Sequence, residues 1–93
     1  MNDKQQEILI IAQEECAEII QVISKIFRFG LDEAYTNQTN RERLQEELGD
    51  LLCMIDLMEQ HALIDKEFLR RASVTKYSKL KQWSKIFKEG TAA

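Results

Sequence analysis

The chain contains no proline, and its three glycines stand at positions 30, 49 and 90. Proline and glycine are the residues that most often interrupt helices, so long segments of this sequence are free to be helical. The sequence therefore predicts an all-α fold. With 93 residues, 44% of them hydrophobic and 31% charged, the chain fits one compact domain that spans residues 1–93.

Three main helices are predicted from the spacing of apolar residues and of capping residues. The first covers about residues 3–27 and stops near Gly30, because glycine favours a helix end. A polar stretch at residues 36–40 follows and is predicted to be a loop. The second helix covers about residues 41–61 and the third about residues 66–87. Side chains that can cap these two helices come just before them, namely Thr39 or Asn40 and then Asp65.

A chain of this length buries only a limited core by itself. Its Ile, Leu and Met residues are spread around long helices, which indicates burial against a partner chain. We therefore expect an antiparallel helical bundle of about three main helices that is completed by dimerisation, as a homodimer or as a homotetramer.

Charge and cysteine usage exclude several classes of protein. The formal net charge of −3 and the pI near 5.2 give no overall basic field, so we expect no nucleic acid partner. No stretch approaches the roughly 20 apolar residues that span a bilayer, so we expect no membrane partner. Cys16 and Cys53 are isolated, without a Cys-x-x-Cys pair or a nearby His, which argues against zinc and disulfides. We predict that both are buried thiols and that the protein is cytoplasmic.

Acidic residues fall on the apolar side of the first predicted helix. At about 100° per residue, Glu15 lies inside a broad apolar arc and Glu18 lies at its edge. Glu14 lies slightly further round, towards the polar side. Two carboxylates of this helix are therefore expected to face the interior. The apolar arc consists of Ile8, Ile11, Cys16, Ile19, Val22, Ile23 and Ile26.

The second predicted helix repeats this arrangement, with Glu47 inside its apolar arc and Asp50 at the edge. A solvated face is the usual fate of such acids, but it would place them opposite the apolar residues. Because unpaired buried carboxylates are costly, we expect a compensating divalent cation. Oxygen ligands without His favour Mg²⁺, or Mn²⁺, over Zn²⁺. The apolar arc consists of Leu44, Leu48, Leu51, Met54, Ile55 and Met58.

Lysines fall within the apolar arc of the third predicted helix. Lys76 and Lys79 are candidates to contact phosphate oxygens in the cavity that the acids face. The simpler interpretation is that they extend to water beside an apolar face, or pair with the acids. Lys25 is a further candidate because it lies two turns beyond Glu18, although a surface lysine at a helix end is common. The arc consists of Phe68, Leu69, Ala72, Leu80, Trp83 and Phe87.

Two segments resemble the motif of the MazG-type all-α nucleotide pyrophosphohydrolases, which is Glu-Glu-x-x-Glu, a variable spacer and Glu-x-x-Asp. The resemblance covers nearly the whole chain and is greatest for the small single-domain versions that phages often encode. The third helix also looks similar to the C-terminal helix of these proteins. The two acidic segments are Glu14-Glu15-Cys16-Ala17-Glu18 and Glu46-Glu47-Leu48-Gly49-Asp50-Leu51-Leu52, and the segment of the third helix is Lys76-x-x-Lys79-Leu80-x-x-Trp83.

The resemblance implies an all-α homodimer that binds Mg²⁺ and hydrolyses a nucleoside triphosphate to the monophosphate and pyrophosphate. It implies a location in the cytoplasm, which is the host's cytoplasm for a phage protein. It also offers a reason for Gly49, namely that a small residue allows another helix or the nucleotide to approach. The implied metal ligands are Glu15, Glu18, Glu47 and Asp50, and the implied catalytic residues are Glu14, Glu15, Lys76 and Lys79.

Other functions fit the same residues. A phosphoribosyl-ATP pyrophosphohydrolase resembles the chain in size and acidic motif, and an all-α dUTPase or dCTPase would use the same metal chemistry. A helical dimerisation module, in which the acids pair with Lys76 and Lys79, is the alternative that is not an enzyme. Several aromatic residues are candidates to stack on a base, although aromatic side chains more often fill a core. These are Phe27, Phe29, Tyr35 and Trp83.

Overall fold

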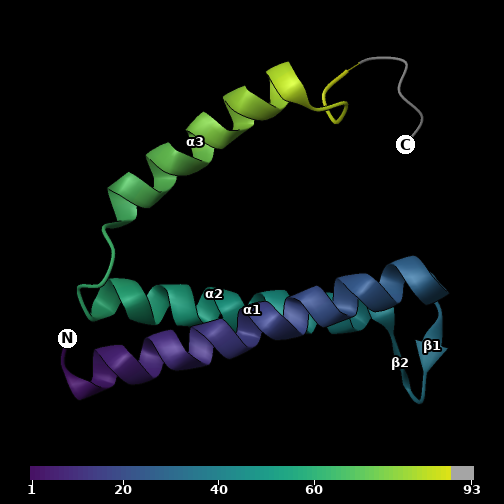
Figure 1. The fold of residues 1–93 in the computed structure, drawn as a ribbon, viewed down its shortest axis with the longest axis horizontal. Helices are drawn as coiled ribbons and strands as arrows, with labels where there is room; N and C mark the ends of the chain where they lie inside the picture. Colours follow the sequence, from purple (N-terminus) through teal and green to yellow (C-terminus); the bar gives the residue numbers. More distant parts are fainter. Residues whose placement is uncertain (89–93) are drawn as a thin grey trace. The chain divides into compact units, whose positions relative to one another are not determined.

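The computed structural model describes residues 1–88, except for the side chain of Tyr35, and confirms the all-α fold. The chain divides into two compact units, Met1–Leu63 and the segment from Ile64 onward, and each is described by itself. The first unit is a hairpin of two helices joined by two short strands, and the second contains one helix (Figure 1). The elements are α1 (Asp3–Phe29), β1 (Ala34–Tyr35), β2 (Gln38–Thr39), α2 (Asn40–Gln60) and α3 (Lys66–Trp83).

Each helix begins at a polar cap. The Asn2 side chain accepts a hydrogen bond from the Gln5 amide, and the Gln5 side chain accepts one from the Asn2 amide, at 2.8 and 3.0 Å. Thr39 and Glu42 form the same reciprocal arrangement at the start of α2. Asp65 accepts from a backbone amide at the start of α3. These bonds satisfy amides that have no partner within the helix, so the predicted caps at Thr39 and Asp65 are confirmed.

The structure differs from the sequence prediction at two places. Part of the polar stretch at 36–40 is paired, since β2 lies antiparallel to β1 with Ala34 opposite Thr39. The turn between the strands contains Thr36 in a left-handed conformation, with φ 61°, which suits a two-residue hairpin turn. Helix α3 ends at Trp83, before the predicted end near residue 87, because Ser84 adopts an extended conformation.

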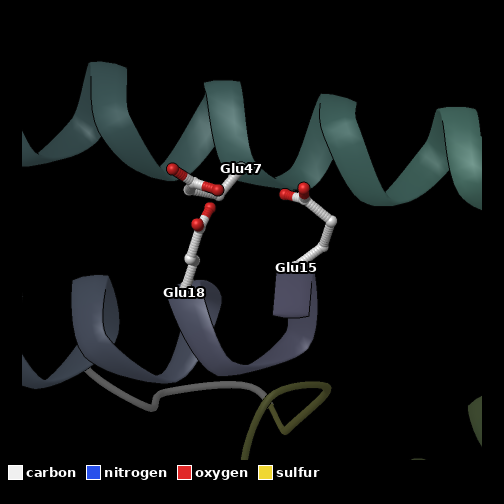
Figure 2. Close-up of side chains that lie close together, drawn as sticks. All are labelled: Glu15, Glu18 and Glu47. Atoms are coloured by element: carbon white, nitrogen blue, oxygen red, sulfur yellow. The ribbon is translucent and has the colours of Figure 1, made fainter. Parts of the chain in front are cut away.

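Helices α1 and α2 pack against each other along a line of facing side chains, which we call the seam. Its positions on both helices are spaced alternately four and three residues apart, the spacing with which helices pack side by side. Every seam side chain is buried or half-buried, and Val22 is the most buried at 1% exposure. Two seam positions carry carboxylates that point towards the opposite helix (Figure 2). The seam consists of Ile8, Ala12, Glu15, Ile19, Val22 and Ile26 on α1 and of Asn40, Leu44, Glu47, Leu51, Met54 and Met58 on α2.

The prediction that Cys16 and Cys53 are buried is wrong, because both are exposed. Each lies one residue from a seam position, Glu15 or Met54, which turns its side chain about 100° away from the other helix. A helix that packs against one neighbour buries a narrower stripe than the broad arc expected from the sequence.

The hairpin has two different faces beside the seam. Because α1 and α2 run antiparallel, residues that follow seam positions point to one side on both helices, and residues that precede them point to the other. The apolar face, on the first side, includes Phe27 at 86% and Ile20 at 69% exposure. It consists of Ile20, Ile23, Phe27, Leu48, Leu52 and Ile55. The polar face, on the other side, includes Glu14, Glu18, Lys25, Arg43, Glu46 and Asp50, whereas Ile11, Cys53 and Leu57 lie on this side nearer the start of α1 and the end of α2.

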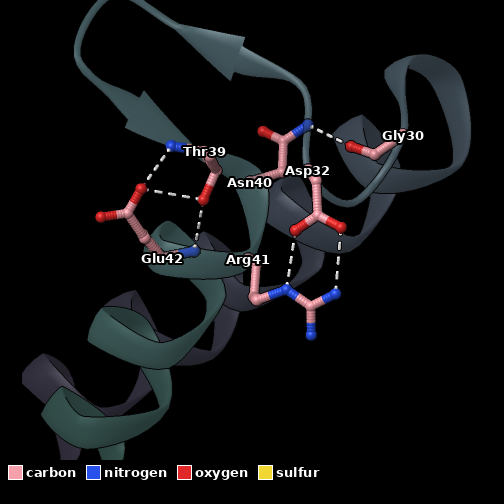
Figure 3. Close-up of polar contacts among 6 residues, drawn as sticks. All are labelled: Gly30, Asp32, Thr39, Asn40, Arg41 and Glu42. Atoms are coloured by element: carbon pink, nitrogen blue, oxygen red, sulfur yellow. Dashed lines mark hydrogen bonds and ion pairs between the residues drawn. The ribbon is translucent and has the colours of Figure 1, made fainter.

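The loop between the helices is fixed by polar contacts at the first turn of α2. Asn40, which is 4% exposed, donates from its side chain to the Gly30 carbonyl at 2.8 Å (Figure 3). The Asn40 amide donates to the Glu33 carbonyl at 3.2 Å. Arg41 forms a two-bond ion pair with Asp32 at 2.7 and 3.1 Å. These contacts hold the loop in one position relative to both helices.

Asn40→Ala is expected to lower the free energy of unfolding by about 1–2 kcal/mol, because it removes a buried hydrogen bond and leaves a gap. Urea unfolding followed by circular dichroism measures the change. Asn37→Ala, at an exposed position in the turn, is the control and should change stability by less than about 0.5 kcal/mol. Equal effects of the two substitutions would contradict the role assigned to Asn40.

Gly49→Ala is expected to raise the free energy of unfolding by up to about 1 kcal/mol, because glycine costs about that much in a helix interior. A Cβ atom at Gly49 would meet no atom of the hairpin within 4 Å, so the change introduces no clash there. The same urea measurement tests this. A loss of stability would mean that another surface packs closely against this position.

Candidate functional site

Three carboxylates converge in the middle of the seam. Glu15 and Glu18 come from α1 and Glu47 comes from α2, and each offers an oxygen within 4.8 Å of the others (Figure 2). Glu15 and Glu47 are half-buried at seam positions, whereas Glu18 is exposed on the polar face. We refer to these three residues as the acidic cluster. The sequence places them together because one helical turn separates Glu15 from Glu18 and the antiparallel hairpin brings Glu47 opposite.

The acidic cluster is electrostatically strained. A hydrogen bond with the Glu18 carboxyl, which requires a proton, raises the pKa of Glu47 to about 7, with desolvation and the charges of Glu18, Glu15 and Asp50 acting in the same direction. Desolvation, followed by the charges of Glu18 and Asp50, raises the pKa of Glu15. One oxygen each of Glu15 and Glu47 is buried without a hydrogen-bond partner. The free cluster therefore favours a proton or another positive charge.

The donor set of the acidic cluster fits a divalent cation. Within residues 1–88, the ion pairs are Arg41 with Asp32 and Arg70 with Glu67, and neither involves the cluster. Carboxylate oxygens without nitrogen or sulfur ligands suit hard cations. The buried oxygens that lack a partner are the atoms that such a cation would satisfy. The cluster could therefore bind a metal ion.

Asp50 and Glu14 lie close to the acidic cluster but outside it. Asp50 is exposed on the polar face, one turn after Glu47, and its charge raises the pKa of both Glu15 and Glu47. Glu14 is also exposed, and its charge is the smallest of the influences that raise the pKa of Glu15. The roles of Asp50 as a metal ligand and of Glu14 in catalysis stay predictions.

Lys76 and Lys79 lie on α3, in the second unit. No residue of α3 is buried, and both lysines line a hollow of about 460 Å³ on this helix. Arg71 lines the same hollow, so three cationic side chains gather there. The predicted contact of Lys76 and Lys79 with phosphate stays a prediction.

Sequence reasoning missed Arg43. This residue lines a cavity of about 480 Å³ in the hairpin, together with Lys25, Phe29 and Glu33. The signal was present in the sequence, because Arg43 stands one helical turn before Glu47. It could not be linked to Lys25 before the register of the two helices was known.

The other aromatic residues predicted to stack on a base are Phe27, Trp83 and Tyr35. Phe27 and Trp83 are exposed at 86% and 80%, and the side chain of Tyr35 is not among the described parts of the chain. Among the described side chains of the hairpin, Phe27 does not line this cavity.

The sequence profile of the MazG nucleotide pyrophosphohydrolase domain matches residues 3–82. The match includes the acidic cluster and most of α3, so it spans both compact units. No curated protein and no solved structure matches the chain. In the part of the chain that the structure describes, no helix combines the length and apolarity needed to cross a membrane.

Without metal ions, the protein is expected to become less stable as the pH rises from about 5 to 8. Glu47 binds a proton with a pKa of about 7 when folded, against an ordinary value of 4.5, so the folded state holds more protons in this range. The raised pKa of Glu15 acts in the same direction. Glu47→Gln should reduce this loss. Urea unfolding in a chelator at pH 5 and pH 8 measures it.

Glu59→Gln is the control for this experiment, because Glu59 is an exposed carboxylate of the same helix outside the seam. It should keep the pH dependence of the unmodified protein. Equal pH dependence in the unmodified protein and in Glu47→Gln would mean that Glu47 does not carry the effect.

Proposed function

Because the chain belongs to the MazG nucleotide pyrophosphohydrolase family, we propose that it hydrolyses a nucleoside or deoxynucleoside triphosphate to the monophosphate and pyrophosphate, with Mg²⁺ as cofactor. The family match extends over residues 3–82 of 93 and supports nucleotide pyrophosphohydrolase activity in general. The choice of substrate and of Mg²⁺ rests on the chemistry of the acidic cluster. Control of the nucleotide pool, or removal of damaged nucleotides, is the role we propose.

The observation that carries this proposal is the placement of Glu15 and Glu47 in the seam. The other seam positions of α1 carry apolar residues, which stabilise a hairpin without any charge. Facing carboxylates with buried, unpartnered oxygens cost stability, and a purely structural module gains nothing from them. A role in binding a cation explains why the sequence has these carboxylates despite the loss of folding stability.

Glu15, Glu18 and Glu47 would hold Mg²⁺, with Asp50 at the edge of the site. The chemistry that bound Mg²⁺ supplies is neutralisation of triphosphate charge and a lowered pKa for water. Three convergent carboxylates would leave room on a bound Mg²⁺ for water and phosphate oxygens. Glu18 is exposed on the polar face, so a ligand can reach the acidic cluster from that side.

In the proposed reaction, a water oxygen attacks the phosphorus of the α-phosphate and the bond to the bridging oxygen of the β-phosphate breaks. Pyrophosphate leaves with the negative charge, and the proton of the water passes to a carboxylate. Glu14 is the proposed acceptor, because it is exposed beside Glu15 on the same helix and is not among the carboxylates that would hold Mg²⁺. Lys76 and Lys79 are proposed to neutralise charge on the pyrophosphate.

We also propose that two copies associate through the apolar face. Ile20, Phe27 and Leu52 are 69%, 86% and 63% exposed in the single chain. A continuous exposed apolar stripe on two adjacent helices is typical of a surface that packs against another pair of helices. The acidic cluster opens on the opposite, polar face, so this association leaves its entrance uncovered. A homotetramer would require a further surface.

The test is product analysis after incubation with each common NTP and dNTP, and with phosphoribosyl-ATP, in the presence of Mg²⁺. We expect monophosphate and pyrophosphate, and a loss of about a hundredfold or more in rate for Glu15→Gln and Glu47→Gln. Mg²⁺ should also raise the melting temperature of the unmodified protein but not that of Glu47→Gln. Glu59→Gln, outside the cluster, should behave as the unmodified protein.

The substrate panel separates the alternatives. Preference for dUTP or dCTP would indicate an all-α dUTPase or dCTPase, and preference for phosphoribosyl-ATP would indicate the enzyme of histidine biosynthesis. If the melting temperature is the same with and without Mg²⁺ and no triphosphate is hydrolysed, the helical dimerisation module would be supported instead.

A further inference from the structure

The cavity beside the acidic cluster is lined by cationic, acidic and aromatic side chains, together with Ala34 and Asn40. Lys25 and Arg43 are half-buried, and within the described residues neither makes an ion pair or a hydrogen bond. The Glu33 carboxylate is likewise without a partner among these residues. Unpaired cations that are partly withdrawn from water are suited to bind an anion. The lining consists of Lys25, Phe29, Glu33, Ala34, Asn40 and Arg43, and the volume is about 480 Å³.

The cavity continues the line of the acidic cluster along the hairpin. On α1, Lys25 follows Glu18 by seven residues, which is about 10 Å along the helix on the same side. On α2, Arg43 precedes Glu47 by four residues, which is about 6 Å. Phe29 lies one turn beyond Lys25. The order from the cluster outward is therefore carboxylates, then cations, then an aromatic ring and the loop that carries Glu33.

The outer end of the cavity is held in place before any ligand binds. The Glu33 carbonyl accepts from the Asn40 amide at 3.2 Å, and the Asn40 side chain bonds to Gly30 at 2.8 Å (Figure 3). The Arg28 guanidinium lies 4.9 Å from the centre of the Phe29 ring, which leaves the other face of the ring for stacking. A loop backbone that is held before binding reduces the entropy lost when a ligand binds.

We propose that this cavity binds the nucleoside end of the substrate and selects guanine. The proposal rests on the function proposed above. Lys25 and Arg43 contact phosphate oxygens that the acidic cluster does not hold, Phe29 stacks on the base, and the Glu33 carboxylate reads its edge. The order of groups along the hairpin thus matches a nucleoside triphosphate whose α-phosphate lies at the acidic cluster and whose sugar and base extend outward from it, away from the pyrophosphate.

The choice of guanine follows from hydrogen-bond chemistry. An ionised carboxylate only accepts hydrogen bonds, through two adjacent oxygens. Guanine presents two adjacent donors, its ring N–H and its amino group, whereas adenine and cytosine present a donor beside an acceptor on the same edge. Uracil and thymine present one donor between two carbonyl acceptors. Glu33 therefore forms two hydrogen bonds with guanine and fewer with the other bases.

The experiment compares GTP with inosine triphosphate, which lacks only the amino group, by kcat/KM with Mg²⁺. The unmodified protein should favour GTP by about tenfold or more. Glu33→Gln should abolish most of this preference, because an amide has a single acceptor oxygen. Glu7→Gln, an exposed carboxylate near the other end of α1, is the matched control and should keep the preference.

Binding of α,β-methylene-GTP and of its inosine counterpart, measured by calorimetry, separates the cavity from the catalytic proposal. Glu33→Gln should weaken binding of the guanine probe about tenfold, and Phe29→Ala should weaken both probes. Guanine-selective binding without hydrolysis of any triphosphate would overturn the proposed function and uphold the cavity. Hydrolysis with a GTP preference that is absent or unchanged in Glu33→Gln would overturn the cavity proposal alone, and the absence of both activities would overturn both.

Discussion

The facing of Glu15 and Glu47 across the seam is the constraint on which the rest of this structure depends. Each helix must bury its apolar residues against the other, and this same packing presses two carboxylates together. Desolvation and repulsion by the charge of Glu18 raise the pKa of Glu15, while the hydrogen bond with Glu18, followed by desolvation and the neighbouring negative charges, raises the pKa of Glu47. Apolar layers on either side, such as the cluster of Ile8, Ala12 and Met54, keep the helices in place despite this repulsion.

The position of a residue relative to the seam also decides on which face of the hairpin its side chain lies. Positions that precede the seam residues place Glu18, Lys25, Arg43 and Asp50 on one side. Positions that follow them place exposed apolar side chains on the other, of which Phe27 is 86% exposed. On each helix, rotation about the helix axis therefore separates the acidic and basic side chains from the exposed apolar ones, without any additional element. A short chain can carry both for this reason.

Local patterns predicted the helices, the caps at Thr39 and Asp65 and the inward direction of Glu15 and Glu47, since each depends on residues within one or two turns. Glu18 was also expected to face the interior, but it is exposed at the edge of the seam. The exposure of Cys16 depends on how wide a stripe the second helix covers, which no single helix encodes. The pairing of Arg43 with Lys25 in one cavity depends on the register between helices. These features could be predicted only once both helices were placed together.

The register has a consequence for insertions and deletions. Ile8 packs near Met54, and Glu15 lies opposite Glu47, so seven residues separate the two layers on each helix. Loss or gain of one residue within either of these seven-residue stretches would rotate one partner by about 100° and remove a carboxylate from the seam. The loop between the helices is not part of either seven-residue stretch, so its length does not affect this spacing. A change in the length of this loop would leave Glu15 opposite Glu47, which agrees with the variable spacer between the two acidic motifs that the family resemblance implies.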